Sequence, residues 1–351
     1  MDCFFAAVEM RENPELQHVP LAVGGSSDRR GVISTCNYIA RQYGIHSAMP
    51  SARAVKLCPD LVLVRGNMEL YKQVSQQIRQ IFLRYSPLIE PLSLDEAYID
   101  VTDSQLFDGS ATLIAQAIRR DIQAETGLTA SAGVAPNKFL AKIASDENKP
   151  DGLFVIRPNQ VESFVSQLDL KKIPGVGKAT LEKLNRLNLF TTADIRNCNQ
   201  AQLNQQFGKF ASVLLERVQG IDNREVKTER IRKSIGVEHT YAEDLSCFDE
   251  SCQPLKKLFD ELLVRIKRSG KSTEINKLSV KLKFNDFQQT TLESSQFQGE
   301  DSVKLENFSY LIEQAWLRAN GRSVRLIGLS VGLSGKPSYT SVSGSQLSFG
   351  F

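Results

Sequence analysis

Hydrophobic positions recur along the chain with two spacings, one typical of helices and one typical of strands. Between Glu69 and Tyr85 they fall three or four residues apart, which predicts an amphipathic helix. Between Lys277 and Phe284 apolar and basic residues alternate strictly, which predicts a strand with one core face and one lysine face. Helices and strands mixed in this way along one chain predict an α+β fold.

Shorter elements are predicted between and around these two. The first 66 residues mix short strands with small helices. A helix is expected from about Thr112 to Glu125, stopped by Gly127, and another begins near Asn137. Strands are expected at Leu128–Val134 and Gly152–Ile156.

Residues 161–219 have an entirely helical pattern that is interrupted three times. The breaks fall at Pro174–Gly177, Asn188 and Gly208, where proline, asparagine or glycine favours a turn. The pattern therefore predicts a set of short helices rather than one long one.

The apolar stretch from Leu88 to Val101 has the pattern of one buried strand, yet it contains two adjacent carboxylates, Asp95 and Glu96. Ionised carboxylates at the edge of a core are costly unless they are paired or bound to a cation. Hard oxygen ligands suit Mg²⁺ that holds a substrate phosphate. A strand end whose acids turn to solvent explains the same residues, so the stretch by itself leaves both interpretations open.

Length and composition narrow the class of protein. A chain of 351 residues exceeds one ordinary core, so about two to four subdomains are expected. No apolar run approaches the length of a membrane span and no signal-peptide pattern is present, which favours a cytoplasmic protein. Six scattered cysteines without a Cys-x-x-Cys pair, and three distant histidines, argue against a disulfide framework and a zinc site.

Basic residues are concentrated in the last third of the chain. The formal net charge is only +3, but residues 224–233 contain five Lys or Arg against two acids, and residues 265–271 contain four without an acid. Together with the lysine face of 277–283, this distribution favours contact with a nucleic-acid backbone over an ordinary solvated surface.

The run Ser93-Leu94-Asp95-Glu96-Ala97-Tyr98, followed by Ile99-Asp100-Val101-Thr102, resembles the palm motif of Y-family DNA polymerases. Six other stretches fall in that family's order: Met1–Glu9, Thr35–Arg41, Lys138–Gly152, Ile173–Lys178, Arg232–Glu238 and Gln346–Phe351. The resemblance covers nearly the whole chain. It implies a multidomain right-hand polymerase with palm, fingers, helical thumb and little-finger domains.

The resemblance also implies where these domains lie. The palm would comprise residues 1–2 and 67–158, and the fingers 3–66. The thumb, with a helix-hairpin-helix, would span 159–220, a linker 221–232 and the little finger 233–335. A Ser-, Gly- and Pro-rich tail, 336–351, is expected to be disordered.

The implied activity is low-fidelity, template-directed translesion DNA synthesis by two-Mg²⁺ nucleotidyl transfer, without proofreading. By resemblance, Asp95 bridges the two metal ions and Glu96 helps hold the ion at the primer hydroxyl. The backbone carbonyl of Met1 would be a further ligand.

The nucleotide site is implied in the same way. Thr35, Tyr38, Arg41 and Lys149 match positions that hold the triphosphate, a task that suits hydroxyl and cationic groups. Phe5 matches an aromatic steric gate that leaves no room for a ribose 2′-hydroxyl. A core role is the alternative for Phe5, and strand alternation predicts that Phe4 beside it points the opposite way.

DNA and protein partners are implied as well, with primer–template DNA, deoxynucleoside triphosphates and a sliding clamp as partners of a monomer. Glycines 175 and 177 would let backbone N–H groups approach a phosphate. The residues expected at the DNA are Gly175, Gly177, Lys178, Arg232, Lys233, Lys281 and Lys283, and those expected at the clamp are Gln346, Leu347, Phe349 and Phe351.

One departure from the family pattern changes the expectation for activity. The family begins with a strand ending in Asp-x-Asp, and the given sequence starts at the middle residue of that triplet, so the first acidic ligand is expected to be absent. Asp2 is not expected to replace it, because neighbouring strand residues point to opposite faces. The chain as given is thus expected to be a poor polymerase.

Two other functions are compatible with parts of the sequence. A catalytically impaired protein that binds DNA and the clamp would explain the departure from the metal-ligand pattern. A repair nuclease or glycosylase that uses the helix-hairpin-helix would leave the palm motifs unexplained.

Overall fold

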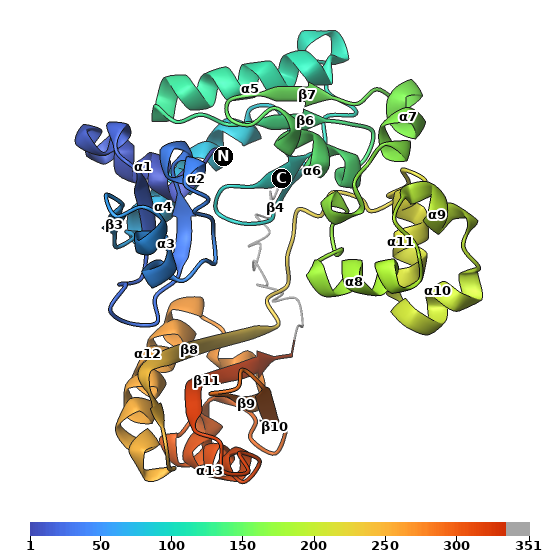
Figure 1. The fold of residues 1–351 in the computed structure, drawn as a ribbon. Coiled ribbons are helices and arrows are strands. Elements are labelled where there is room, and N and C mark those ends of the chain that lie inside the picture. The colour runs from blue at the N-terminus through green and yellow to red at the C-terminus, as the bar shows by residue number, and fades with distance from the viewer. Residues whose placement is uncertain (335–351) are drawn as a thin grey trace, which may run out of the picture. The chain divides into compact units, whose positions relative to one another are not determined.

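The structure is a computed structural model that describes residues 1–334, and it contains two compact units (Figure 1). The first comprises Met1–Glu229, and the second begins at Arg230. Each unit has its own buried apolar core. In the part of the chain that the structure describes, no helix is both long and apolar enough to cross a membrane.

The first 66 residues form a small sheet with helices around it. Strand β1 (Leu21–Gly24) lies in the middle, antiparallel to β2 (Ile33–Cys36) and parallel to β3 (Val62–Val64). The same region contains three helices, α1 (Phe4–Glu12), α2 (Tyr38–Gln42) and α3 (Ser51–Leu57). Leu21, Ala22 and Val23 of β1 are buried, so a shift in its pairing with β2 or β3 would move apolar side chains out of the core.

Two long amphipathic helices follow the predicted pattern. Helix α4 (Met68–Leu83) buries Tyr71, Val74, Ile78 and Ile81, which are three or four residues apart and so share one face. Helix α5 (Ala111–Thr126) ends at Gly127, whose φ of 68° is the left-handed C-cap conformation. Both helix predictions are confirmed.

The acidic stretch differs from the prediction, because it forms two short strands instead of one. Strand β4 (Ile89–Pro91) pairs antiparallel with β5 (Ala97–Ile99), and the acids lie in the turn between them. Pro91 lacks an N–H group, and the backbone N–H groups of Leu92 and Ser93 both donate to the Glu96 carbonyl. These bonds close a turn that apolar pattern alone does not reveal.

Strands β6 (Ala132–Val134) and β7 (Leu153–Val155) form a second, parallel pair, connected through α6 (Lys138–Glu147). Helix α6 begins beside Asn137 as predicted, and the Asn137 side chain caps it by accepting from Leu140 N at 3.0 Å. A Cβ atom on Gly133 would lie 2.2 Å from the Ala141 carbonyl oxygen, so glycine permits the close approach of helix and strand. Within residues 1–334, β5 pairs only with β4 and β6 only with β7, so this region holds two small sheets and not a single layer.

Residues 161–218 form the predicted series of short helices. These are α7 (Val161–Ser166), α8 (Lys178–Arg186), α9 (Thr192–Asn197), α10 (Gln200–Phe207) and α11 (Phe210–Val218). The predicted breaks at Gly175, Asn188 and Gly208 all have positive φ angles. Apolar side chains from the helices share one core, which includes Leu184, Ile195 and Leu214.

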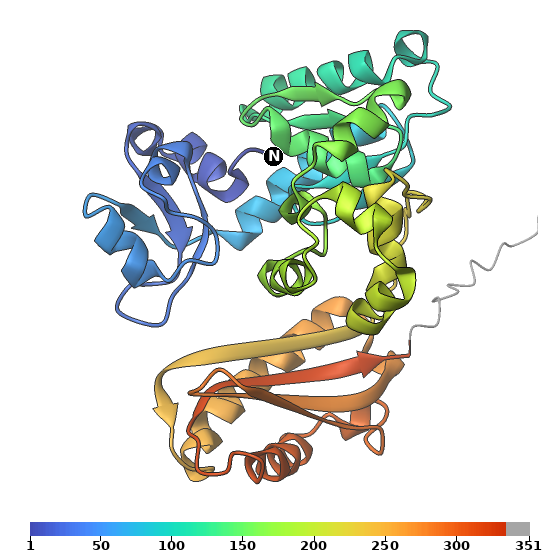
Figure 2. The same ribbon diagram turned by 45° about the vertical axis from the view of Figure 1, so that its right-hand side comes forward.

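The second unit is a four-stranded antiparallel sheet with helices α12 (Cys252–Ser269) and α13 (Leu305–Trp316) packed against it (Figure 2). The strand order is β10 (Gln289–Ser294), β9 (Ile275–Phe284), β11 (Val324–Leu333) and β8 (Ser234–Leu245). In β9 the alternating Leu278, Val280, Leu282 and Phe284 lie in the core with both helices. The predicted division of this strand into a core face and a lysine face is confirmed.

Short 3₁₀ helices complete the connections, at Pro14–His18, Leu106–Gly109, Pro158–Gln160, Leu170–Lys172, Asp249–Ser251, Ser272–Glu274 and Glu300–Ser302.

Candidate active site and nucleic-acid interface

One cavity in the first unit gathers the residues that the sequence singled out for metal and nucleotide binding. Its volume is about 250 Å³. Its lining comes from four stretches that are far apart in the sequence: Met1, Cys3, Phe4 and Phe5; Ser34, Thr35, Tyr38, Arg41 and Ser47; Asp95 and Glu96; and Lys149. We refer to it as the acidic cavity.

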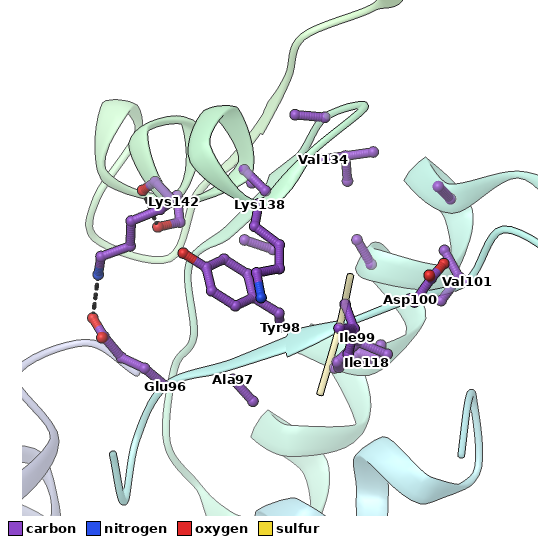
Figure 3. A pocket seen from close by; sticks show the side chains of 18 of the residues that line it. Glu96, Ala97, Tyr98, Ile99, Asp100, Val101, Ile118, Val134, Lys138 and Lys142 are labelled. Atoms are coloured by element: carbon purple, nitrogen blue, oxygen red, sulfur yellow. Dashed lines mark hydrogen bonds and ion pairs between the residues drawn. The ribbon is translucent and has the colours of Figure 1, made fainter. Parts of the chain in front are cut away.

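The two carboxylates enter this cavity from the turn between β4 and β5. Ser93 Oγ donates to Asp95 Oδ1 at 2.7 Å, and the Met1 amino group donates to the Asp95 carbonyl at 2.8 Å. Glu96 forms an ion pair with Lys142 of α6, and the side chains of this pair are 36% and 30% exposed (Figure 3). The turn is thus tied to two other segments of the unit, which fixes the acids in place.

Asp2 does not contribute to the acidic cavity, although the reason differs from the predicted one. The residue is not in a strand. It is 2% exposed, and its carboxylate accepts from Ser131 Oγ at 2.7 Å and from Asp151 N at 2.9 Å. These bonds tie the Asp2 carboxylate to Ser131 and Asp151, and Asp2 is not among the residues that line the acidic cavity.

The donors around the acids suit a magnesium ion that also binds substrate. Among residues 1–334 no group of three or more His, Cys, Asp or Glu is placed to hold a metal ion by itself. In sites that process nucleotides, Mg²⁺ is bound by one or two carboxylates together with substrate phosphates, and does not need a complete protein cage. Asp95 and Glu96 therefore fit an ion shared with a triphosphate.

The hydroxyl and cationic groups lie at the end of β2 and on α2. Asn37 caps α2 by accepting from Ala40 N at 2.9 Å, and this start places Tyr38 and Arg41 one turn apart. The Arg41 guanidinium carbon lies 4.7 Å from the centroid of the Tyr38 ring. The Tyr38 hydroxyl is buried without a hydrogen-bond partner, and burial raises its pKa to about 12. A neutral donor without a partner at a cavity wall suits an anionic oxygen as ligand.

Lys149 completes the cationic side of the cavity. Its Nζ lies 2.6 Å from Asp146 Oδ1, and its side chain is 26% exposed. Arg41 and Lys149 thus approach the cavity from two different parts of the unit, β2–α2 and the segment after α6.

Phe5 lines the cavity from the first turn of α1. Its ring is stacked on Tyr71 of α4, with the centroids 4.3 Å apart and the planes inclined by 10°. Tyr71 is 1% exposed and donates its hydroxyl proton to Glu9. The predicted opposite directions of Phe4 and Phe5 are wrong, because both residues belong to a helix and both line the cavity.

A second, larger cavity of about 560 Å³ lies beside the acids, between β5 and β6. Its apolar lining includes Ile99, Val101, Ile118 and Val134 (Figure 3). Lys138 lies at its edge, 5.3 Å from the Tyr98 ring centroid and in an ion pair with Glu90 at 2.6 Å. The residues that line this groove come from stretches far apart in the sequence.

The start of the predicted linker is firmly packed against the first unit. The Asp222 side chain is fully buried and accepts from Arg217 Nη2 at 3.0 Å, from Arg224 Nε at 2.7 Å and from Phe139 N at 3.0 Å. A few residues later, Lys227 N donates to Glu90 at 2.8 Å. Residues 222–227 therefore have a fixed path.

The predicted helix-hairpin-helix turn has an open side. Gly175 has a φ of 95°, and a Cβ atom there would lie 2.8 Å from Phe210 Cε2. Gly177 precedes α8, and a Cβ atom there would meet nothing within 4 Å. Lys178 is the first residue of α8. The turn is thus packed at Gly175 and unobstructed at Gly177.

The predicted DNA-contacting residues of the second unit lie on and just before the sheet. Lys281 pairs with Glu238 at 2.9 Å, and Lys283 Nζ is 5.0 Å from the Phe287 ring centroid. Arg232 and Lys233 are exposed immediately before β8. The predicted clamp residues Gln346, Leu347, Phe349 and Phe351 lie outside the described residues.

Sequence comparisons match nearly the whole chain to known proteins. Residues 1–146 match the impB/mucB/samB family, residues 232–347 its C-terminal domain, and residues 171–222 the thumb domain of DNA polymerase-iota. DNA polymerase IV of Shewanella baltica strain OS195 is 59% identical over 334 residues, covering 95% of this chain and 92% of the relative. DNA polymerase IV of Shewanella pealeana is 56% identical over 354 residues, covering 100% and 98%.

Solved structures give the same result. A Y-family DNA polymerase chimera of Dbh and Dpo4 matches with a TM-score of 0.86 and 30% identity, covering 94% of this chain and 96% of the chimera. The chain belongs to the Y family of DNA polymerases. An insertion ternary complex of Dbh DNA polymerase matches with a TM-score of 0.66 and 29% identity, covering 95% and 96%.

Membership of the Y family makes the chain a DNA-directed DNA polymerase of the translesion class, in a family that depends on metal ions.

Sequence reasoning missed two residues that the structure places at the candidate site. Tyr71 supports Phe5, and Lys142 pairs with Glu96. The apolar spacing of α4 marked the helix but not Tyr71, and Lys142 was included in the Lys138–Gly152 stretch without being singled out.

Proposed function

We propose that this Y-family polymerase adds deoxynucleotides to a primer 3′-end on a DNA template at the acidic cavity, with low fidelity and without proofreading. The observation that supports this most is the convergence of two carboxylates, a set of hydroxyl and cationic groups and an aromatic ring from four separate stretches on one cavity. Few other activities need all three kinds of group together.

The acids would hold the metal ions. Two bound Mg²⁺ ions would supply activation of the primer hydroxyl and stabilisation of the charge on the phosphates. Asp95, Glu96 and the Met1 carbonyl are the residues that would hold them. Lys142 pairs with the Glu96 carboxylate and so limits its movement.

The opposite wall would hold the triphosphate. Arg41 presents a fork of donors, Lys149 a point charge, and Thr35 and Tyr38 hydroxyls. The unpartnered Tyr38 hydroxyl supports this assignment, because a phosphate oxygen would satisfy it.

Phe5 would select the sugar. A ring stacked on buried Tyr71 cannot retreat from the cavity, so a ribose 2′-hydroxyl would clash with it while a deoxyribose would not.

The DNA would be held by the thumb turn and the second unit. The open space at Gly177 would let a phosphate approach the backbone N–H groups at the start of α8, next to Lys178. The sheet offers Lys281 and Lys283, with Arg232 and Lys233 before it. Gln346, Leu347, Phe349 and Phe351 would bind a sliding clamp, so deleting residues 346–351 should remove stimulation by the clamp and spare unassisted synthesis. The protein would act as a cytoplasmic monomer.

A second candidate is a catalytically impaired DNA- and clamp-binding protein. The observation in its favour is that, among residues 1–334, only two carboxylates line the acidic cavity, whereas two closely spaced cations require several anions between them.

Primer extension and DNA binding, measured on the same preparation, distinguish the active polymerase from the catalytically impaired binding protein. We expect templated extension of a labelled primer with Mg²⁺ and the four deoxynucleotides, and its loss in Asp95→Asn. The exposed Asp60→Asn is the control and should extend like the parent. Tight primer–template binding without extension by the parent would favour the second candidate.

A further inference from the structure

The lysine face of the second unit's sheet is crossed by an ion pair. In the sheet register, Gly328 of β11 lies between Glu238 of β8 and Lys281 of β9. Lys281 Nζ and Glu238 Oε2 are 2.9 Å apart, so the pair bridges the central strand. A Cβ atom on Gly328 would lie 3.2 Å from Glu238 Cβ and 3.4 Å from Lys281 Cβ, and its absence leaves room for the two side chains.

A second pair lies on the same sheet. Lys277 Nζ of β9 is 2.6 Å from Glu293 Oε2 of β10, and Ser279 Oγ donates to Glu293 Oε1 at 3.2 Å. The Lys277 ammonium holds the pKa of Glu293 below its usual value. Two of the lysines predicted to face phosphate therefore already have carboxylate partners.

Both pairs are accessible to a ligand. The side chains of Lys281 and Glu238 are 33% and 53% exposed, and those of Lys277 and Glu293 are 38% and 51% exposed. Exposed pairs of this kind are worth at most about a fivefold change in an equilibrium constant. A DNA phosphate could therefore displace the carboxylates, at a cost of similar size.

We propose that Glu238 and Glu293 restrain the DNA affinity of this sheet by holding Lys281 and Lys277 in ion pairs that DNA phosphates have to displace. The proposal rests on the proposed DNA contact of this sheet. A lysine that neutralises a phosphate releases a counterion from the DNA, which favours binding. A carboxylate on the same face acts as a built-in counterion for the lysine and repels the phosphate, so each pair reduces that gain.

Removing one carboxylate tests the proposal directly. Glu238→Gln keeps the shape of the side chain and frees Lys281. We expect primer–template binding, measured by fluorescence anisotropy of the full chain at about 50 mM salt, to tighten about fivefold. The slope of log K against log[salt] should steepen by about 0.9, the value for one additional phosphate contact.

Glu261→Gln is the matched control. Glu261 lies on α12, on the helix-covered side of the same sheet, where it pairs with His239 at 2.9 Å. The Glu261→Gln substitution removes the same charge as Glu238→Gln from the same unit, but away from the lysine face. The affinity for DNA should therefore change less than about twofold. Thermal unfolding of each variant verifies that the sheet is intact.

A double-mutant cycle separates failure of the restraint from failure of the DNA contact. Lys281→Met should weaken binding by less than about twofold in the parent, but by about fivefold in the Glu238→Gln background. If Lys281→Met weakens DNA binding equally in the parent and in Glu238→Gln, and Glu238→Gln does not tighten binding, the proposed restraint is wrong but the sheet still contacts DNA. If none of the variants alters binding, the sheet does not contact DNA, and both ideas fail.

Discussion

The Phe5 ring lies flat against Tyr71, with ring centroids 4.3 Å apart and an angle of 10° between the planes. Tyr71 is fully buried in α4 and held by Glu9, so it forms a rigid backing for a half-buried ring at the cavity wall. The stack joins the first helix of the chain to the long helix α4. The position of Phe5 is therefore set by packing rather than by its own flexible rotamers.

Shortening Phe5 should relax selection of the sugar. Phe5→Val removes the ring that would meet a ribose 2′-hydroxyl, so ribonucleotide incorporation should rise at least tenfold relative to deoxynucleotide incorporation. Single-nucleotide insertion kinetics with matched ribo- and deoxynucleotides measure the ratio. Tyr71→Phe, which keeps the stack and removes only the hydroxyl, should leave the ratio near that of the parent. An unchanged ratio in Phe5→Val would assign Phe5 to the core alone.

The two glycines of the thumb turn should respond differently to alanine. Gly175→Ala places a Cβ atom 2.8 Å from Phe210 at a φ of 95°, so it should lower the free energy of unfolding by about 1–3 kcal/mol. Gly177→Ala meets open space and should cost less than about 1 kcal/mol. Urea denaturation followed by circular dichroism compares them. Equal losses would mean that the turn is not packed as described.

Asp222 should make the first unit sensitive to acid. Burial by itself would raise the pKa of this carboxyl, but Arg224 and Arg217 hold it below its usual value. Its stabilising effect is complete above the unfolded pKa of about 3.9 and is lost as pH falls through the lower folded value. Urea denaturation between pH 7 and pH 2 measures this dependence.

Asp222→Asn should lower the free energy of unfolding at pH 7 by about 3–5 kcal/mol, since it removes the buried carboxylate that neutralises Arg217. Asp222→Asn should also reduce the loss of unfolding free energy as the pH falls. The exposed Asp60→Asn is the comparison, with an expected change within about 0.5 kcal/mol. A stability of Asp222→Asn equal to that of Asp60→Asn would contradict the buried network.

Local sequence pattern was sufficient to predict those helices and strands that depend on residues close together in the chain. The spacing of apolar residues located α4, Gly127 located the end of α5, and alternation located the two faces of β9. The turn at Asp95 was missed because two backbone bonds to Glu96, rather than apolar content, close it. The helical start at Phe4 was missed because Cys3, in a left-handed conformation, turns the chain before strand alternation can apply.

The site was predictable in its residue types but not in its supporting contacts. Asp95, Glu96 and Arg41 were singled out by chemistry and resemblance, and they line one cavity. The pairs Lys142–Glu96 and Lys138–Glu90 join residues more than forty positions apart in the sequence. Nothing in the local pattern of either partner indicates the other, because such pairs arise only when β4, β5 and α6 have packed.

Nucleotidyl transfer is the central activity that we propose for the acidic cavity. Its most direct test is single-turnover primer extension by Glu96→Gln, with primer–template binding measured on the same protein. The control is Glu147→Gln, which removes an equal charge from the end of α6, where Glu147 pairs with Lys172 at 2.6 Å. We predict that Glu96→Gln lowers the extension rate at least a hundredfold while DNA affinity changes less than about threefold, and that Glu147→Gln extends like the parent. Extension by Glu96→Gln within tenfold of the parent would show that Glu96 is not needed for nucleotidyl transfer.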